Sequence, residues 1–168
     1  MMRLSPHNLA QLPAEVARPA YDPGTVTCGI LHLGLGNFHR AHQAAATEAV
    51  LADGALGWGI AGVSLRRPDQ RNRLEPQGGL YTLCMREAAG SRRRVIGALR
   101  EIAVLPAAPD HVLQRFADPR IRIVSLTVTE KGYAADPRTG ELLTDDPALR
   151  LDLAAAGAPV STLGLIAA

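Results

Sequence analysis

The chain has 168 residues, of which 47% are hydrophobic and 20% are charged, and its formal net charge is +2. This composition is typical of a globular protein, and the chain is long enough to bury a core. The small net charge argues against a nucleic-acid partner. No apolar run reaches about 18 residues, so the sequence predicts no membrane-spanning helix.

The N-terminal region is polar and rich in proline. We expect residues 1–24 to form a surface arm ahead of a partial dinucleotide-binding domain at 25–168. The prolines rule out a long helix in the arm, although a short one around Asn8–Ala17 is compatible with the sequence. No leader with an apolar centre is visible, which favours a cytoplasmic protein. Cys28 and Cys84 lack the spacing of metal ligands, so we expect two small buried side chains and no metal site.

A glycine turn between a strand and a helix is the central feature of the chain. The apolar run Thr27–Leu33 predicts a buried strand, and the alanine-rich run Phe38–Asp53 predicts a helix that ends at Gly54. Between them, Gly34 lets the chain turn sharply, and Gly36 has no Cβ to block the approach of a phosphate. A strand, a glycine turn and a helix in this order can hold a dinucleotide pyrophosphate at the helix N-terminus.

The turn departs from the full fingerprint because His39 stands where a third glycine is usual. On spacing alone, a phosphate-binding turn and an ordinary tight turn are equally supported. Asn37 is expected to cap the helix. The cationic residues His39, Arg40 and His42 in its first turn are either solvated or partners of an anion, since cations there oppose the helix dipole. The helical period predicts the buried face of the helix at Phe38, Ala41, Ala45, Ala49 and Ala52.

A second strand is predicted at Trp58–Leu65, and its end should lie near the adenosine ribose of a dinucleotide. An acid usually binds the ribose hydroxyls there, but Arg66 occupies the expected place and Asp69 follows it. Asp69 can reach back to the ribose or merely begin a helix, whereas Arg66 can meet a 2′-phosphate. In the first strand, His32 is interpreted as a satisfied core residue, because a lone histidine in an apolar strand is more often structural than catalytic.

The middle of the chain predicts an inserted hairpin and a third parallel strand. Leu80–Arg86 and Arg94–Leu99 are strand-like runs around a turn, and the arginines beside that turn are interpreted as solvated. A helix is predicted from a cap at Asp110 to Ala117, and a strand at Ile121–Thr127. The carboxyl end of this strand should lie at the same edge of the sheet as the glycine turn, which is the edge where such parallel sheets bind ligands. Glu130 and Lys131, which follow this strand, are either residues of the site or charged surface residues. Short helices are expected at Pro147–Leu153 and after Pro159.

Three segments of the sequence resemble the mannitol dehydrogenase and fructuronate reductase family, the long-chain polyol dehydrogenases. They are Gly34–His42 (GLGNFHRAH), Gly78–Leu83 (GGLYTL) and Arg122–Tyr133 (RIVSLTVTEKGY). The resemblance runs from about Ile30 to the C-terminus, in order and with compatible spacing. It implies an α/β fold with a Rossmann-like parallel sheet, flanking helices and an inserted β-hairpin, here truncated.

The resemblance also implies a function. The expected cofactor is NAD, and the expected reaction is hydride transfer at secondary alcohols of polyols or hexuronates, with no nucleic acid or membrane as partner. The cofactor-binding residues that we expect are Gly34, Gly36, Asn37, Phe38, Arg40, Asp69, Thr129 and Glu130. No catalytic residue is expected here, because the family's catalytic lysine lies in a substrate domain that this sequence does not match. The second half of the sheet is also taken to be absent, which would leave one edge of the first strand unpaired. The alternative function is an inactive remnant that acts as a binding or interaction module.

Overall fold

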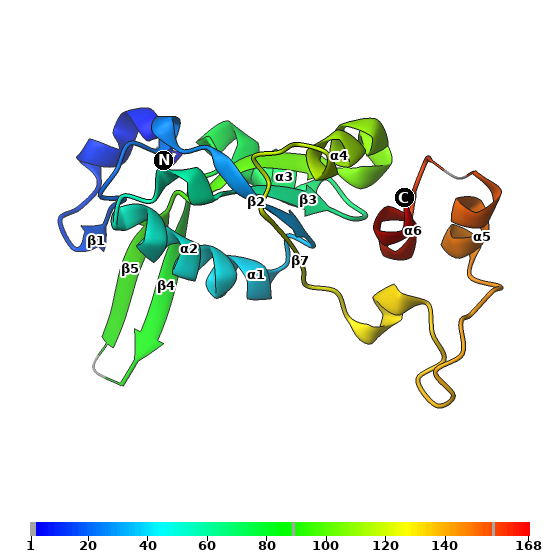
Figure 1. Cartoon of the computed structure of the whole chain (residues 1–168). Helices are drawn as coiled ribbons and strands as arrows, with labels where there is room; N and C mark the ends of the chain where they lie inside the picture. The colour runs from blue at the N-terminus through cyan, green and yellow to red at the C-terminus, as the bar shows by residue number, and fades with distance from the viewer. Residues whose placement is uncertain (1–2, 89, 156) are drawn as a thin grey trace.

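A four-stranded parallel sheet forms the centre of the fold (Figure 1). The structure, a computed structural model, describes residues 3–88, 90–155 and 157–168, and of Glu130 and Lys131 it describes the backbone alone. The strands of the sheet are β2 (Cys28–Leu33), β3 (Gly59–Ser64), β6 (Leu99–Val104) and β7 (Ile123–Leu126). They lie in the order β6-β3-β2-β7, and every neighbouring pair is parallel. The predicted Rossmann-like sheet is confirmed.

The position of β7 corrects one prediction from the sequence. β7 pairs with β2 on the side away from β3, so the first strand is paired on both edges. In the doubly wound order, this is the place of the first strand of the second half. The error arose because the start of β6 was read as the end of the hairpin, so that β7 was counted as the third strand. Ile123 and Val124 on the outer strand are 45% and 47% exposed.

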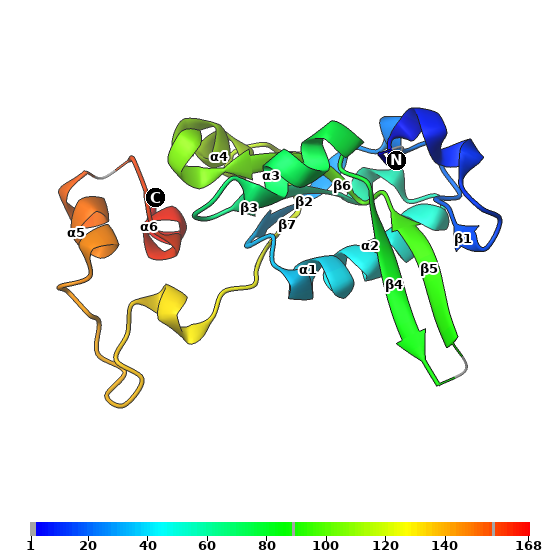
Figure 2. The ribbon, with the colours of Figure 1, turned by 180° about the vertical axis from the view of Figure 1, so that it is seen from behind.

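The inserted hairpin is confirmed and projects away from the sheet (Figure 2). It consists of β4 (Tyr81–Glu87) and β5 (Gly90–Ile96), which pair antiparallel. The short strand β1 (Val16–Ala17) pairs parallel with β5. The short helix that the sequence allowed around Asn8–Ala17 is therefore not formed over that range: residues Pro6–Gln11 form a 3₁₀ helix, and a turn after Pro13 leads into β1.

The two cysteines differ in their exposure. Cys28 is half-buried at the start of β2, and burial raises the pKa of its thiol to about 11. Cys84 lies on the exposed side of the hairpin, so its predicted burial is wrong. Both thiols are free.

The helix after the glycine turn breaks into two. α1 (Asn37–Ala41) and α2 (Gln43–Ala52) are separated at His42, whose backbone has φ −117° and ψ −71°. The cap of α1 is Gly36 rather than Asn37. The buried face of α2 also differs from the prediction and consists of Ala44, Thr47, Glu48 and Leu51.

The buried face of α2 is hard to predict from the sequence because two of its residues, Thr47 and Glu48, are polar. The Glu48 carboxylate is 3% exposed and accepts hydrogen bonds from the Tyr21 hydroxyl (2.8 Å) and the Gly97 amide (2.6 Å). Because the partners of Glu48 come from the arm and from the segment before β6, a pattern confined to the helix cannot show that it is buried. Phe38, which was expected to be buried, is 67% exposed.

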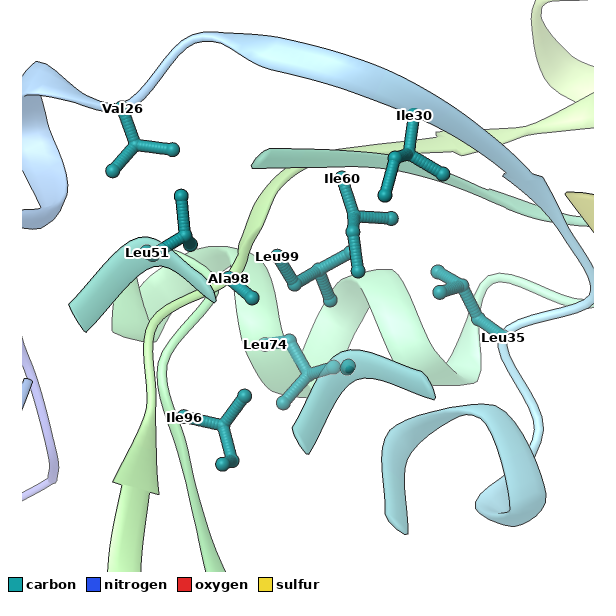
Figure 3. Close-up of a cluster of buried hydrophobic side chains, with 10 residues drawn as sticks. Val26, Ile30, Leu35, Leu51, Ile60, Leu74, Ile96, Ala98 and Leu99 are labelled. Carbon is teal, nitrogen blue, oxygen red and sulfur yellow. The ribbon is translucent and has the colours of Figure 1, made fainter. Parts of the chain in front are cut away.

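Two apolar clusters cover the two faces of the sheet, because successive side chains of a strand point to opposite sides. One contains Ile30 and Ile60 with residues of α2 and of α3 (Asp69–Leu74), and Figure 3 shows this cluster. The other contains Leu31 and Ala61 with residues of α4 (Pro109–Phe116) and α6 (Thr162–Ala167).

The remaining helices follow the sequence closely. α5 (Pro147–Ala154) is capped by Asp146, whose carboxylate accepts from the amides of Ala148 and Leu149. Asp110 lies in the first turn of α4 rather than at its cap, which is Ala108. Over residues 3–88, 90–155 and 157–168, no helix combines the length and the apolar character needed to span a bilayer.

Candidate functional site

A cavity of about 360 Å³ lies at the carboxyl ends of β2, β3 and β7. The strand order places it where β3 and β7 diverge on either side of β2, which is where open α/β sheets bind ligands. The described residues that line it are Gly34, Leu35, Gly36, Ser64, Leu65, Arg66, Thr127, Val128, Thr129, Gly132 and Thr162. The glycine turn and the loop after β7 therefore share one rim, as the sequence predicts.

Gly34 is required by the fold itself. Its φ is +103°, which an L side chain rarely adopts, and an added Cβ would lie 2.5 Å from the Thr127 carbonyl oxygen. The amide of Gly34 donates to the Val63 carbonyl (2.9 Å), and the amide of Thr127 donates to the Leu33 carbonyl (3.0 Å). These contacts hold the turn between β3 and β7.

Gly36 has no such constraint from the protein. Its backbone has φ −74° and ψ 178°, which any residue adopts, and an added Cβ would have no described atom within 4 Å. Its carbonyl accepts from the Arg40 amide, while the next amides at the start of α1 have no acceptor within the helix. The space in front of Gly36 is thus open and lies beside the first amides of α1, which suits an anionic group.

Arg40 lies beside the turn and is held by neutral oxygens. Its guanidinium donates to the side-chain oxygens of Gln70 and Asn37, and burial lowers its pKa. The Tyr81 hydroxyl donates to the Arg40 carbonyl (2.7 Å), which ties the hairpin to the end of α1. Arg40 and Asn37 belong to the turn, but neither is among the residues that line the cavity.

Two other expected residues lie outside the cavity. Phe38 projects into solvent, where its ring contacts that of His42 at a centroid distance of 4.7 Å. Asp69 is exposed, begins α3 and does not line the cavity, so its contact with a ligand stays a prediction. Thr129 does line the cavity, whereas the side chain of Glu130 lies outside the described residues.

Ser64 and Arg66 occupy the place at the end of β3 where an acid is usual. Ser64 is 5% exposed, and its hydroxyl has no hydrogen-bond partner among the described residues. Arg66 is exposed, and both residues line the cavity. Sequence reasoning identified Arg66 but missed Ser64, which ends the strand as an inconspicuous small residue.

Two buried histidines lie beneath the glycine turn. His32 and His39 are both 0% exposed, and their rings stack with centroids 3.6 Å apart and an interplanar angle of 15°. The interpretation of His32 as a satisfied core residue is confirmed, because its Nδ1 contacts Ser125 Oγ (2.9 Å) and its Nε2 contacts Thr127 Oγ1 (3.0 Å). His39, which was expected to be either solvated or a partner of an anion, is not solvated but fully buried. Its place at the third glycine position was the signal in the sequence.

Burial keeps both rings neutral. Desolvation lowers the pKa of His32 to about 4, with His39 contributing in the same direction. Desolvation also lowers the pKa of His39, and the neighbouring Arg40 lowers it further.

The described lining of the cavity is suited to binding rather than to proton transfer. It offers glycine backbone, three hydroxyl groups of serine or threonine in addition to Thr129, and one guanidinium, but no described carboxylate, imidazole or amine. Within the part of the chain that the structure describes, no group of three or more His, Cys, Asp or Glu residues is arranged to hold a metal ion. A ligand with negative charge and hydroxyl groups fits this lining.

Sequence comparison identifies a family and related oxidoreductases. The family model for the mannitol dehydrogenase Rossmann domain matches residues 28–163. The chain is 40% identical over 159 residues to the uncharacterised oxidoreductase YeiQ of Escherichia coli (strain K12), which covers 92% of this chain and 32% of YeiQ. It is 39% identical over 163 residues to the polyol:NADP oxidoreductase of Gluconobacter oxydans (strain 621H), which covers 94% of this chain and 33% of that protein.

A solved structure shares the fold over nearly the whole chain. Mannitol 2-dehydrogenase from Pseudomonas fluorescens, in a ternary complex with NAD and D-mannitol, matches with a TM-score of 0.90 at 40% identity. The match covers 98% of this chain and 34% of that chain. The chain thus spans about a third of the length of the relatives that it matches.

Proposed function

The chain belongs to the mannitol dehydrogenase family, whose Rossmann domain it represents, and on this basis we propose that it binds the nicotinamide dinucleotide NAD. The proposed site is the cavity at the carboxyl ends of β2, β3 and β7. The NAD complex of the Pseudomonas fluorescens relative supports this choice of ligand class.

The observation that carries the proposal is the contrast between the two glycines. Gly34 is a glycine for reasons of folding, whereas neither backbone conformation nor packing requires glycine at position 36. An open position in front of the first amides of α1 is what a phosphate group needs in order to approach the backbone closely. We therefore assign the pyrophosphate to the segment Gly34–Phe38. Beside it would lie the Arg40 side chain, which donates a hydrogen bond to Asn37 of that segment.

The two ends of the dinucleotide are assigned by the strands that border them. The adenosine ribose would lie at the end of β3, beside Ser64 and Arg66, which line the cavity whereas Asp69 does not. The nicotinamide end would lie toward the loop after β7, where Thr129 offers a hydroxyl. Glu130 is adjacent in sequence, and its part in binding stays a prediction because its side chain lies outside the described residues.

For the activity, we propose a polyol or hexuronate oxidoreductase that transfers hydride between NAD and a secondary alcohol. The cofactor supplies the hydride chemistry, and the role of this chain is to bind and orient it. One observation favours the alternative of a binding module without activity. Reduction of a ketone needs a proton donor near the oxygen, and the described lining of the cavity holds no acid or base for that task.

The test is a titration of the 168-residue chain with NADH, followed by nicotinamide fluorescence, with ADP-ribose as a competitor. We expect a saturable change that ADP-ribose reverses, because both compounds contain the adenosine and pyrophosphate groups. Arg93→Ala is a suitable control, since Arg93 is an exposed residue of the hairpin outside the cavity, and its titration should match that of the unmodified chain. A folded chain that shows no response to NADH would refute the proposal.

A further inference from the structure

A chain of partly buried polar contacts connects four elements directly beneath the glycine turn. His32 lies on β2, His39 on α1, Gln43 on α2 and Ser125 on β7. His39 Nδ1 lies 3.1 Å from Gln43 Oε1, and Gln43 Nε2 donates to Ser125 Oγ (2.8 Å). Ser125 Oγ in turn lies 2.9 Å from His32 Nδ1. The two ends of this path meet again through the stacked rings of the two histidines.

The chemistry of these atoms fixes the direction of every hydrogen bond. His32 Nε2 lies 3.1 Å from the Gly34 carbonyl oxygen, which can only accept, and 3.0 Å from Thr127 Oγ1, whose own proton goes to that carbonyl. The proton of the neutral ring is therefore on Nε2 and is shared between these two oxygens. His32 Nδ1 must then accept from the Ser125 hydroxyl, and Ser125 Oγ accepts from Gln43. Gln43 Oε1 therefore accepts from His39, whose proton is on Nδ1. One directed path thus runs from His39 to the Gly34 carbonyl.

The Gly34 carbonyl is where this path meets the turn. Besides His32, it accepts from the Gly36 amide (2.7 Å) and from the Thr127 hydroxyl (2.8 Å). Two full donors and the shared proton of His32 around one carbonyl oxygen fix the peptide plane between Gly34 and Leu35. With that plane fixed and the Gly36 amide turned inward, the orientation of the following residues at the start of α1 is determined as well.

We infer that His32 and His39 are positioning residues of the dinucleotide turn, and this inference rests on the proposed function. A third glycine usually brings the helix close to the strand at this place. Here the stacked rings occupy the space between α1 and β2, and hydrogen bonds through Gln43 and Ser125 hold them there. The histidine pair replaces that close backbone contact with a contact between side chains, and His32 also anchors the carbonyl of Gly34.

The test interrupts the path at Ser125, which does not line the cavity. Ser125→Ala removes both the donor to His32 and the acceptor of Gln43, while Ser125→Thr keeps the hydroxyl. Glu48→Gln serves as the matched control. Glu48 is a buried polar residue of α2, the helix that carries Gln43, but its partners Tyr21 and Gly97 are not part of the turn. For each 168-residue protein, the melting temperature and the dissociation constants for NADH and ADP-ribose are measured.

We expect Ser125→Ala to weaken binding of both compounds about tenfold, the effect of roughly one lost hydrogen bond, and Ser125→Thr to restore it. Glu48→Gln should lower the melting temperature, because Glu48 is a buried group with two hydrogen-bond partners. It should leave the dissociation constants within about twofold, because those partners, Tyr21 and Gly97, are not part of the turn. Equal dissociation constants in the unmodified protein and Ser125→Ala, or losses that simply follow the melting temperatures, would overturn the inference.

A second measurement does not depend on ligand binding. The imidazole ¹⁵N chemical shifts report the tautomers, and we expect the proton on Nε2 in His32 and on Nδ1 in His39. The amide signals of Gly34 and Gly36 should shift in Ser125→Ala and not in Glu48→Gln. The opposite tautomer in His32, or unmoved glycine signals in Ser125→Ala, would overturn the inference. Failure of the unmodified chain to bind NADH, with these signals as expected, would instead refute the proposed function.

Discussion

Replacement of Gly36 by valine separates cofactor binding from folding. The backbone angles at Gly36 suit any residue, and the position of an added Cβ has no described atom within 4 Å. A glycine-to-alanine change at a compatible site stabilises a protein by about 0.4–1 kcal/mol, while alanine is a poorer helix cap than glycine by a similar amount. Gly36→Ala should therefore change the free energy of unfolding by no more than about 0.5 kcal/mol, and Gly36→Val by little more.

The effect on binding should be much larger. The valine methyl groups would fill the open position in front of the first amides of α1, where the pyrophosphate is assigned. Loss of that close approach is worth at least about 2 kcal/mol, or roughly a 30-fold increase in the dissociation constant for NADH. Gly36→Ala should give an intermediate increase.

Gly34→Ala is the reciprocal control. Its φ of +103° and the Cβ position 2.5 Å from the Thr127 carbonyl oxygen predict a loss of about 2–5 kcal/mol of folding stability. The assay combines thermal unfolding with NADH fluorescence titration for all four proteins. If Gly36→Val and the unmodified chain bind NADH equally, or if Gly36→Val loses as much stability as Gly34→Ala, the assignment of the phosphate to this turn is refuted.

Three further predictions follow from the site. We expect NADH to bind more tightly than NADPH in a competition titration; tighter NADPH binding that disappears in Arg66→Ala, but not in Arg93→Ala, would place a 2′-phosphate on Arg66 and contradict the NAD assignment. The 168-residue chain should not oxidise NADH with fructose, fructuronate or tagaturonate, because the described lining lacks a proton donor; steady turnover in that assay would show that a donor is present. The free energy of unfolding should fall by about 3 kcal/mol as the pH drops from His32's ordinary pKa of 6.5 to about 4, because the unfolded chain binds a proton that the buried ring excludes; urea unfolding that is independent of pH over this interval would contradict the burial of a neutral ring.

Local patterns in the sequence were sufficient for the elements whose signals are contiguous. The run before Gly34, the first strand of the hairpin and the helix beginning at Pro147 were all predicted at nearly their observed bounds, whereas the second hairpin strand begins at Gly90 rather than Arg94 and the helix after Gly36 is divided at His42. The family was indicated by the same kind of signal, because its motifs are short and uninterrupted. In each case a few neighbouring residues determine the backbone conformation through glycine turns, proline positions or an apolar run.

The candidate site was predictable only in part. Gly34, Gly36 and Thr129 line the cavity as expected, since turns and loops at the ends of parallel strands share one edge of the sheet. Asp69 does not line it, and Ser64 does, although neither position could be ranked from the sequence. Distances across the sheet edge depend on how each strand ends, and a single sequence does not contain that information.

What the sequence determined by itself is the order of strand, glycine turn and helix, and the family that this order and its motifs indicate. Only the tertiary structure decided that β7 lies beside β2 and that His39 is buried against His32. It also decided that Gly34 is needed for the fold while Gly36 is left open. The physical reason is the separation of the partners along the chain. Ser125 lies 93 residues from His32, and the burial of a polar group is favourable only when such a distant partner satisfies it.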